Sequence, residues 1–386
     1  MKYDYIITGT GAAGLSLAYY LSQSSLKEKR VLLIDRAKKN KNDRTWCFWE
    51  NGDNPFETIV HHTWEELYFK SPTLDKLMDI SPYRYKMIQG LDFYNHILNI
   101  LKQHPNFEII QDEVKSIDNQ IDKAIVHTKN NTFEAHFVFN SIVFEYVDFS
   151  KSNSLAQHFG GWIIETEAPV FDPSKATLMD FRIPQCDETR FMYLLPTSQN
   201  TALIEATAFS NNILSAAQYD DMIVDYIQEF TEIGAYKILH KEIGVIPMTN
   251  YNFKKNNQSN VIHIGTMGGN VKSSTGYAFM SIQNFTKKIV TALEKEESPH
   301  LKQHWFDKRF VIYDSILLNV MLKKRVPIQQ VFSLLFKRNK AGNVLKFLGE
   351  QTSFLRELSV IIAAPKIPFL QAAFDEMWQL IRRKKA

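Results

Sequence analysis

The sequence predicts an α/β protein in which a Rossmann-type nucleotide-binding domain is interrupted by a β-rich domain and followed by a helical region. A strand, a glycine turn and a helix stand at the N-terminus, and a second strand, glycine loop and helix return near residue 261. Alternating apolar residues between these two motifs are typical of β-strands. We therefore expect residues 1–150 and 250–298 to form the discontinuous nucleotide-binding domain, 151–249 the β-rich substrate domain, and 299–386 the helical C-terminal region.

The first element is the segment "DYIITGTGAAGLSLAYYLSQ", which carries G-x-G-x-x-G at Gly9, Gly11 and Gly14. Such glycines allow a tight turn, close approach of backbone to a pyrophosphate, and close packing of helix on strand. A helix beginning near Ala12 would direct its free N–H groups and positive dipole at the phosphates. The next strand, "RVLLID", ends at Asp35, where a carboxylate can bind the ribose hydroxyls of adenosine. A glycine turn that binds no dinucleotide is the alternative. The candidate cofactor-binding residues of this segment are Gly9, Gly11, Ala12, Ala13, Gly14, Asp35 and Arg36.

The choice between FAD and NAD(P) depends on the second glycine motif, "NVIHIGTMGGNVKSSTGYAFMSIQNFTKKIV". An N-terminal fingerprint in a long chain without repeats favours FAD. In FAD-dependent hydroxylases a late strand, loop and helix close over the flavin, usually with Gly-Asp after the strand, where this chain has Gly265-Thr266. We predict an FAD-binding domain of the hydroxylase-like flavoprotein plan, to which Gly265, Gly268 and Gly269 contribute.

The intervening chain supplies the other elements. After Asp35 comes the aromatic segment "DRTWCFWE", then an irregular stretch to about Leu91 and an amphipathic helix, "DFYNHILNILKQ". Strands follow, with a hairpin around Asn130-Asn131. The predicted strands of the β-rich unit are "GWIIETEA", "ATLMDFRI", "RFMYLLP" and "NTALIEATAF", and the helix "AQYDDMIVDYIQEF" comes after them.

The composition indicates the cellular compartment of the protein. Its two cysteines, Cys47 and Cys186, predict neither a disulfide framework nor a metal site, and they favour a reducing compartment. The N-terminus shows no export leader, and no window is apolar enough to span a membrane. We therefore expect a cytoplasmic protein without a metal ion.

The basic C-terminal region suggests a partner. Residues 301–386 contain 16 Lys/Arg and 6 Asp/Glu, although the formal net charge of the chain is only +3. Apolar residues recur there at helical spacing: Phe306, Phe310, Tyr313, Leu317 and Val320. An apolar face beside basic residues favours an anionic membrane surface over nucleic acid. Attachment through residues 305–386, with the terminal "IRRKKA" at the headgroups, is one interpretation, and a core-facing helix with solvated lysines is the other.

One carboxylate stands among small and apolar residues in "TALIEATAFS". Strand alternation places Glu205 on the face of Leu203, Thr207 and Phe209. Burial there would raise its pKa and keep the acid protonated near neutral pH, as a proton donor requires. An edge-strand glutamate facing water is the alternative, and the pattern alone leaves both open.

Taken together, "GTGAAG", "RTWCF", "RFMYLLP…ALIEATAF", "GTMGGNVKSSTGY" and "PKIPFLQA" resemble the lycopene cyclases of the bacterial β-cyclase type. They recur in the right order over nearly the whole chain. The resemblance implies that Glu205 matches the required acid of the "IE" strand motif and that the glycine fingerprint and Asp35 bind FAD. The family usually has two consecutive acids in this strand, whereas here Glu205 is followed by Ala206.

The resemblance implies cyclisation of the ψ end groups of lycopene to β-ionone rings, giving γ- or β-carotene. A proton adds to the terminal double bond, the cation closes a ring and a proton is lost, so the enzyme is an isomerase. It also implies reduced FAD, with NAD(P)H as the electron source. Aromatic faces can stabilise a cation. The candidates, each of which could instead be ordinary core packing, are Trp46, Phe48, Trp49, Trp162, Tyr193 and Tyr277.

Expected partners are lycopene or a related acyclic carotenoid, the inner face of the membrane and other carotenoid-pathway enzymes, but not nucleic acid. Two other functions fit the same fold. An FAD-dependent hydroxylase or prenyl reductase would consume NAD(P)H stoichiometrically and would not need Glu205. A non-catalytic dinucleotide-sensing module would bind FAD or NAD without turnover.

Overall fold

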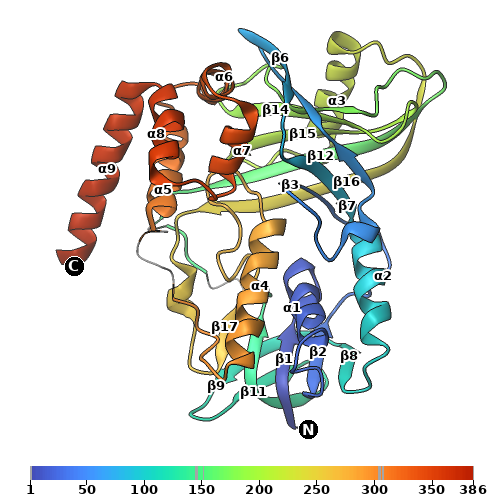
Figure 1. The fold of residues 1–386 in the computed structure, drawn as a ribbon, viewed down its shortest axis with the longest axis vertical. Coiled ribbons are helices and arrows are strands. Elements are labelled where there is room, and N and C mark those ends of the chain that lie inside the picture. The colour runs from blue at the N-terminus through green and yellow to red at the C-terminus, as the bar shows by residue number, and fades with distance from the viewer. Residues whose placement is uncertain (1, 144–146, 151, 303–305, 307, 386) are drawn as a thin grey trace.

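The computed structural model describes residues 2–143, 147–150, 152–302, 306 and 308–385. Two large sheets lie toward opposite ends of the molecule, with helices and a small sheet between them (Figure 1). The first sheet has the order β8-β2-β1-β11-β10-β9, with β17 paired to β11. Its strands are β1 Lys2–Thr8, β2 Val31–Asp35, β8 Phe107–Gln111, β9 Val114–Asn119, β10 Ala124–Thr128, β11 Thr132–Asn140 and β17 Val261–His263.

Strands β1, β2, β8, β11 and β17 run parallel, which requires a crossover between β1 and β2. That crossover is α1 (Ala12–Ser22), a helix whose residues are mostly buried. It packs against α2 (Gly90–Leu101) and α4 (Phe279–Glu294), and their apolar faces share one core with β1 and β2. The predicted strand-turn-helix motifs at both ends of this domain are confirmed.

The second sheet has the order β16-β12-β15-β14-β13-β5-β6. Helix α3 (Ala216–Phe230) covers one face, and the sequence prediction of this helix and of four strands is confirmed. Its strands are β5 Glu66–Ser71, β6 Leu74–Asp79, β12 Ser154–Thr166, β13 Lys175–Asp180, β14 Thr189–Pro196, β15 Thr201–Ser210 and β16 Tyr236–Thr249.

A three-stranded sheet, β3 (Thr45–Glu50), β7 (Arg84–Gln89) and β4 (His62–Trp64), joins the two large sheets. The prediction of an irregular stretch up to Leu91 is wrong, because β4 to β7 occupy most of it. These strands are short and pair with partners distant in sequence, so local pattern signals them weakly. The domain boundaries remain a proposal, in which β5 and β6 now join the β-rich unit. Two 3₁₀ turns complete these regions, Glu57–Ile59 and Phe253–Asn256.

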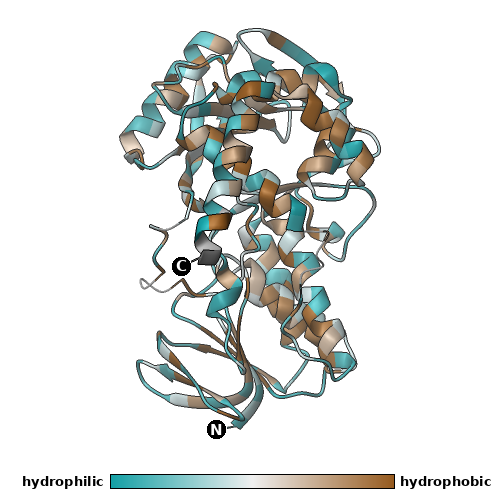
Figure 2. Cartoon of the chain, turned by 90° about the vertical axis from the view of Figure 1, so that its left-hand side faces the viewer, coloured by the Kyte–Doolittle hydropathy of each residue, from teal (hydrophilic) through white to brown (hydrophobic). Residues whose placement is uncertain are grey.

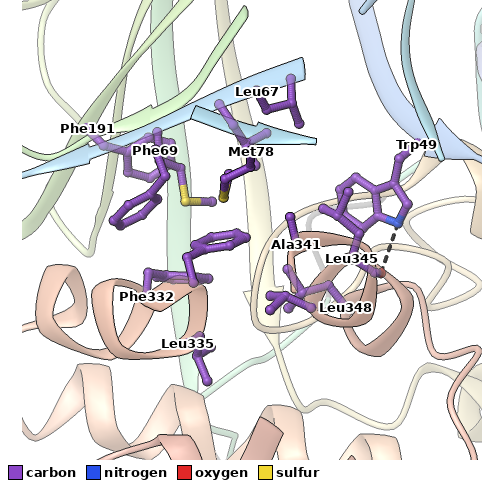
Figure 3. Packing of buried hydrophobic residues seen from close by; sticks show 14 of the residues in the cluster. Trp49, Leu67, Phe69, Met78, Phe191, Phe332, Leu335, Ala341, Leu345 and Leu348 are labelled. Atoms are coloured by element: carbon purple, nitrogen blue, oxygen red, sulfur yellow. Dashed lines mark hydrogen bonds between the residues drawn. The ribbon is translucent and has the colours of Figure 1, made fainter. Parts of the chain in front are cut away.

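The described residues of the C-terminal region, 306 and 308–385, contain five α-helices: α5 Lys308–Leu322, α6 Ile328–Arg338, α7 Ala341–Leu348, α8 Phe354–Ala363 and α9 Lys366–Lys385. Figure 3 shows α6 and α7 packed on the second sheet, with Phe332 near Phe69 and Met78. The indole N–H of Trp49 in β3 donates to the carbonyl of Leu345 in α7 at 3.0 Å (Figure 3). This region therefore shares a core with the β-rich unit.

The predicted apolar face of α5 does not point outward as a whole. Phe310 and Val320 are buried, and Tyr313 bonds Glu357 of α8, so the core-facing interpretation holds for this helix. Among the described residues, no helix is both long and apolar enough to cross a membrane. Of the terminal "IRRKKA", the side chains of residues 383–385 and the whole of 386 lie outside the described residues.

Candidate active site

The two glycine motifs converge on the start of α1. Gly9 follows β1 with φ of +87°, a backbone conformation that favours glycine. A Cβ at Gly14 would lie 1.9 Å from the Gly9 carbonyl oxygen, so only glycine allows this approach of helix to turn. A Cβ at Gly265, in the second loop, would lie 2.9 Å from the Ala13 Cβ. The structure therefore brings the first and second candidate cofactor segments into contact.

The N-terminus of α1 meets the requirements of a dinucleotide phosphate. Its N-cap is Gly11, and the first turn contains no acidic residue. Among the described residues, no side chain caps the helix and no atom would lie within 4 Å of a Cβ at Gly11. Ala12 and Ala13 begin the helix, so its first-turn N–H groups are at a position suited to an anion.

Asp35 ends β2 beside this turn. Its Oδ2 accepts hydrogen bonds from the Thr10 N–H at 2.7 Å and the Thr10 hydroxyl at 3.0 Å, and Oδ1 accepts from the Ala37 N–H. Burial favours the neutral acid, but these N–H bonds hold the pKa of Asp35 below its usual value. The Lys39 ammonium, 3.4 Å from Oδ2, also favours the ionised carboxylate. Oδ1 keeps one lone pair that could accept from a ribose hydroxyl. Arg36 is exposed beside it.

The second glycine loop contains buried oxygens without partners. Gly265 and Gly269 adopt φ of +62° and +72°, and Gly268 packs against the His263 carbonyl. Within the described part of the chain, Asn270 Oδ1 and Thr275 Oγ1 find no hydrogen-bond partner although both side chains are buried. Such atoms usually meet a ligand or water, so the residues present fit a bound dinucleotide.

Glu205 stands in β15 between Tyr193 of β14 and Gly161 of β12. It shares its face with Leu203 and Phe209, as predicted, and both pack in the core that joins the second sheet to the helical region. Its Oε1 accepts from the Thr207 hydroxyl at 2.9 Å. Burial, with the neighbouring Glu242 carboxyl, raises the pKa of Glu205 to about 8, and Thr207 opposes this in part. The side chain keeps some accessible surface.

A second acid, Glu242 of β16, lies across the same glycine. Gly161 pairs with Glu205 on one side and Glu242 on the other, and the two carboxyl groups are hydrogen-bonded. Glu242 is 7% exposed, and its Oε2 accepts from the Thr45 hydroxyl at 2.9 Å. Burial raises the pKa of Glu242, while Thr45, His240 and Arg44 oppose the rise.

Aromatic and thiol side chains line the other side of Glu205. Burial raises the pKa values of Cys47, Tyr85 and Tyr193, and their proximity to the Glu205 carboxyl adds to the rise. The hydroxyl oxygens of Tyr193 and Tyr277 lie 3.4 Å apart. The rings of Trp49 and Tyr277 pack edge to face, with their centres 4.5 Å apart. Of the predicted cation-pocket residues, the structure brings together Trp49, Tyr193 and Tyr277.

The other three aromatic candidates lie elsewhere. Trp46 and Phe48 point to the opposite side of β3, where Phe48 stacks on Phe279 in the nucleotide-domain core. Trp162 lies on the α3 face of the second sheet, and its indole N–H donates to Asp220 at 2.8 Å. Their prediction as pocket residues is corrected, because successive residues of a strand face opposite sides.

Sequence reasoning missed Thr45, Cys47, Tyr85, Thr207 as a donor, and Glu242. Alternation in "TWCFWE" separates Thr45, Cys47 and Trp49 from Trp46 and Phe48, so this signal was present. No local signal places Glu242, because its position follows from the pairing of β12 with β16.

Comparison with known proteins first defines the class. The fold resembles p-nitrophenol 4-monooxygenase PnpA from Pseudomonas putida, with TM-score 0.60, 14% identity and coverage of 95% of this chain and 100% of that one. It also resembles a geranylgeranyl bacteriochlorophyll reductase-like protein from Thermoplasma acidophilum, with TM-score 0.58 and 11% identity. That match covers 96% of this chain and 95% of the other. The chain thus has the fold of the flavoprotein monooxygenases, as predicted.

The family follows from the sequence itself. The model of the lycopene cyclase protein family matches residues 4–374, so the chain belongs to the lycopene cyclase family. A lycopene beta-cyclase of Pantoea ananas is 24% identical over 64% of this chain and 63% of its own length. A lycopene beta-cyclase from a Paracoccus species is 26% identical, and the match covers 55% of this chain and 57% of the relative's length. The matches thus span about three fifths of these relatives.

Proposed function

We propose that the chain is a lycopene β-cyclase that binds FAD and acts on an acyclic carotenoid at the inner face of the membrane. The observation that carries this proposal is the position of Glu205, on a strand face shared with Leu203 and Phe209 and opposite Tyr193, where burial and the neighbouring Glu242 raise its pKa to about 8. A hydrocarbon has no polar group through which an enzyme could activate it, so a cyclase must supply the proton from a desolvated acid. Family membership supplies the substrate class.

In the proposed reaction, Glu205 gives its proton to the terminal double bond of the polyene, forming a C–H bond as its O–H bond breaks. The neighbouring double bond attacks the tertiary cation and closes a six-membered ring. A C–H bond beside the cation then breaks, so protons and electrons balance and product mass equals substrate mass. The rings of Trp49, Tyr193 and Tyr277 can stabilise the cation by about 0.5–2 kcal/mol each.

The cofactor segments around Gly9, Asp35 and Gly265 would hold FAD, with the pyrophosphate at the N-terminus of α1 and the ribose at Asp35. When bound in its reduced form, FAD would supply negative charge that stabilises a cationic transition state. NAD(P)H would be the source of the electrons. The structure of PltM, a halogenase solved with FAD, covers this chain completely at TM-score 0.56 and 12% identity.

Membrane attachment would use α8 and α9 rather than α5. In α9, which lies at the edge of the molecule (Figure 1), the exposed apolar residues recur every three or four positions along one face. Figure 2 looks onto this side, and hydrophobic and hydrophilic residues alternate along the helix that ends at the C-terminus. The exposed apolar residues are Phe354, Leu355, Leu358, Ile361 and Ile362 of α8, and Ile367, Leu370, Phe374, Met377, Trp378 and Ile381 of α9.

The basic residues beside this apolar face favour anionic lipid. Arg356 and Lys366 are exposed, and the Arg382 guanidinium lies 5.3 Å from the centre of the Trp378 ring. Each such cation near an anionic surface contributes about 1 kcal/mol. A substrate dissolved in the bilayer would then reach the enzyme from the lipid.

The function is tested by expressing the chain in bacteria that accumulate lycopene. We expect the red pigment to become yellow-orange at unchanged mass, and Glu205→Gln to leave it red with the protein still folded. Unchanged pigment with the wild-type chain would refute the function. A product heavier by oxygen or hydrogen atoms would support the hydroxylase or reductase alternative.

Attachment is tested by flotation with vesicles containing anionic phosphatidylglycerol. The double variant Phe374→Ser/Trp378→Ser should lose most of its vesicle binding, whereas Ile121→Ser, which removes an exposed apolar residue of the nucleotide-binding domain, should not. Equal binding of both variants would overturn the role of α9.

A further inference from the structure

Glu205 belongs to a pair of acids whose surroundings differ. Between β15 and β16 lies β12, and its Gly161 is directly opposite both Glu205 and Glu242. A Cβ at Gly161 would lie 3.1 Å from Leu203 Cδ1, 3.4 Å from Glu205 Cβ and 3.4 Å from Glu242 Cγ. The two acidic side chains therefore flank the position that a side chain at residue 161 would occupy on the intervening strand.

The neighbouring Gly160 serves a different purpose. A Cβ there would lie 2.6 Å from the Tyr219 Cβ of α3, on the other face of the sheet. The Gly160-Gly161 pair thus accommodates a helix on one face and joins two acids on the other.

The donors around the pair are unequal. Glu242 accepts from the Thr45 hydroxyl at 2.9 Å, and the cationic Arg44 and the imidazole of His240 stabilise its negative charge. Glu205 accepts only from Thr207 among the hydrogen-bond donors described, and no cation appears among the groups that affect it. Two carboxylates in contact cannot both stay ionised, and the one whose negative charge has more stabilising partners keeps the charge.

We infer that Glu242 is the positioning residue of the proton donor: it carries the negative charge of a singly protonated pair and thereby keeps the proton on Glu205. This inference rests on the proposed function and deepens it.

The pair also accounts for proton return. Once Glu205 has given its proton to the substrate carbon, two carboxylates face each other beside a carbocation. Their negative charges stabilise the cation, and their mutual repulsion makes Glu205 a strong base for the proton that the ring carbon loses. The proton count of the pair is restored at the end of each turnover, with no other donor required.

Several titratable groups face the pair from the elements packed against it. They are Asp43 and Arg44 just before β3, Cys47 of β3, Tyr85 of β7, Tyr193 of β14, His240 of β16 and Tyr277 of the second glycine loop. Burial holds the pKa values of Cys47 and the three tyrosines above their usual range. Cys47 and the three tyrosines are therefore not expected to contribute to the pH dependence near neutrality.

The test compares Glu242→Gln with the wild type by the pH dependence of kcat/KM on lycopene in vesicles and by the infrared band of the protonated carboxyl. The variant keeps the hydrogen bond but removes the like charge, so both the basic limb of activity and the carboxyl titration should move to lower pH. At pH 8 we expect activity to fall about tenfold or more, with recovery in more acidic buffer. Glu165→Gln, which replaces an exposed acid of β12, should change neither profile.

Gly161→Ala provides a second test that keeps both acids. The added methyl group would contact both acidic side chains and approach Leu203 Cδ1 to 3.1 Å, so it should displace the two acids relative to each other. The same shift to lower pH is then expected without loss of either titratable group. Unshifted profiles in folded Glu242→Gln and Gly161→Ala would overturn the inference while leaving the cyclase function intact. Loss of activity at every pH, with an unmoved carboxyl band, would also overturn it. Failure of the wild-type chain to cyclise lycopene would instead refute the proposed function.

Discussion

Two glutamates of this molecule, Glu205 in the second sheet and the fully buried Glu357 in the C-terminal helices, have opposite surroundings. Glu357, in the C-terminal helices, accepts from Arg309 Nη2 at 2.8 Å, from the Tyr313 hydroxyl at 3.1 Å and from the Thr352 hydroxyl at 3.1 Å. Although burial alone favours the neutral acid, these partners hold the pKa of Glu357 below its usual value. Glu205 has one hydroxyl donor and a second acid instead, and its pKa rises to about 8.

The different partners of Glu357 and Glu205 indicate what each carboxyl group contributes to stability or to catalysis. A buried carboxylate with a bidentate arginine and two hydroxyl donors is compensated, so it joins α5 to α8 and has no proton to give. A buried acid beside another acid keeps its proton at a cost in stability. We therefore expect Glu357 to matter for folding and Glu205 for chemistry.

Glutamine substitution at the two positions should give the largest contrast. Glu205→Gln should lower kcat for lycopene by about 10²–10⁴-fold, because it removes the acidic proton. Its melting temperature should stay the same or rise, since the substitution also removes a carboxyl group that is costly to ionise. Pigment analysis and thermal unfolding of the purified protein measure the two effects.

Glu357→Gln is the matched control, and it should lower the free energy of unfolding by about 2 kcal/mol because Arg309 loses its carboxylate partner. Its activity per folded molecule should be retained. A lower free energy of unfolding in Glu205→Gln, with an unchanged one in Glu357→Gln, would contradict these assigned roles.

The pH dependences should run in opposite directions. Activity requires protonated Glu205, so kcat/KM should fall as pH rises through about 8. Glu357 has a lowered folded pKa, so its contribution to stability is present above its unfolded pKa of about 4.5 and is lost as pH falls through the lower, folded value. A pH–rate profile and urea unfolding at several pH values follow each effect.

Removal of one hydroxyl donor should give the smallest effects. Thr207→Val leaves the Glu205 carboxylate without its hydroxyl donor, so the pKa of Glu205 should rise further and the basic limb of activity should move to higher pH. Tyr313→Phe should instead lower the free energy of unfolding by about 1 kcal/mol without moving that limb. A shift of the limb to lower pH in Thr207→Val would contradict the assigned hydrogen bond.

Sequence reasoning reached the nucleotide-binding motifs because each is local. Gly9, Gly11, Gly14 and Asp35 lie within one strand-helix-strand unit, and their spacing alone predicts the turn and the strand end. Glu205 could also be predicted, because strand alternation assigns the face on which it lies and the resemblance to lycopene cyclases implies its role.

The remainder of the site depends on pairing between distant strands. Glu242 meets Glu205 only because β12 lies between β15 and β16 with Gly161 in register with both. Trp162 follows that glycine by one residue, and one residue in a strand is the difference between the two faces of the sheet. Pattern alone could not supply this register.

The central claim is that Glu205 holds its proton at neutral pH inside the folded enzyme. The direct measurement is an infrared pH titration of the protonated carboxyl band, taken as the difference between wild type and Glu205→Gln. We expect a band that is present at pH 7 and disappears with a midpoint near pH 8. A band already absent at pH 7, with a midpoint near the ordinary glutamate pKa of about 4.5, would contradict a protonated Glu205.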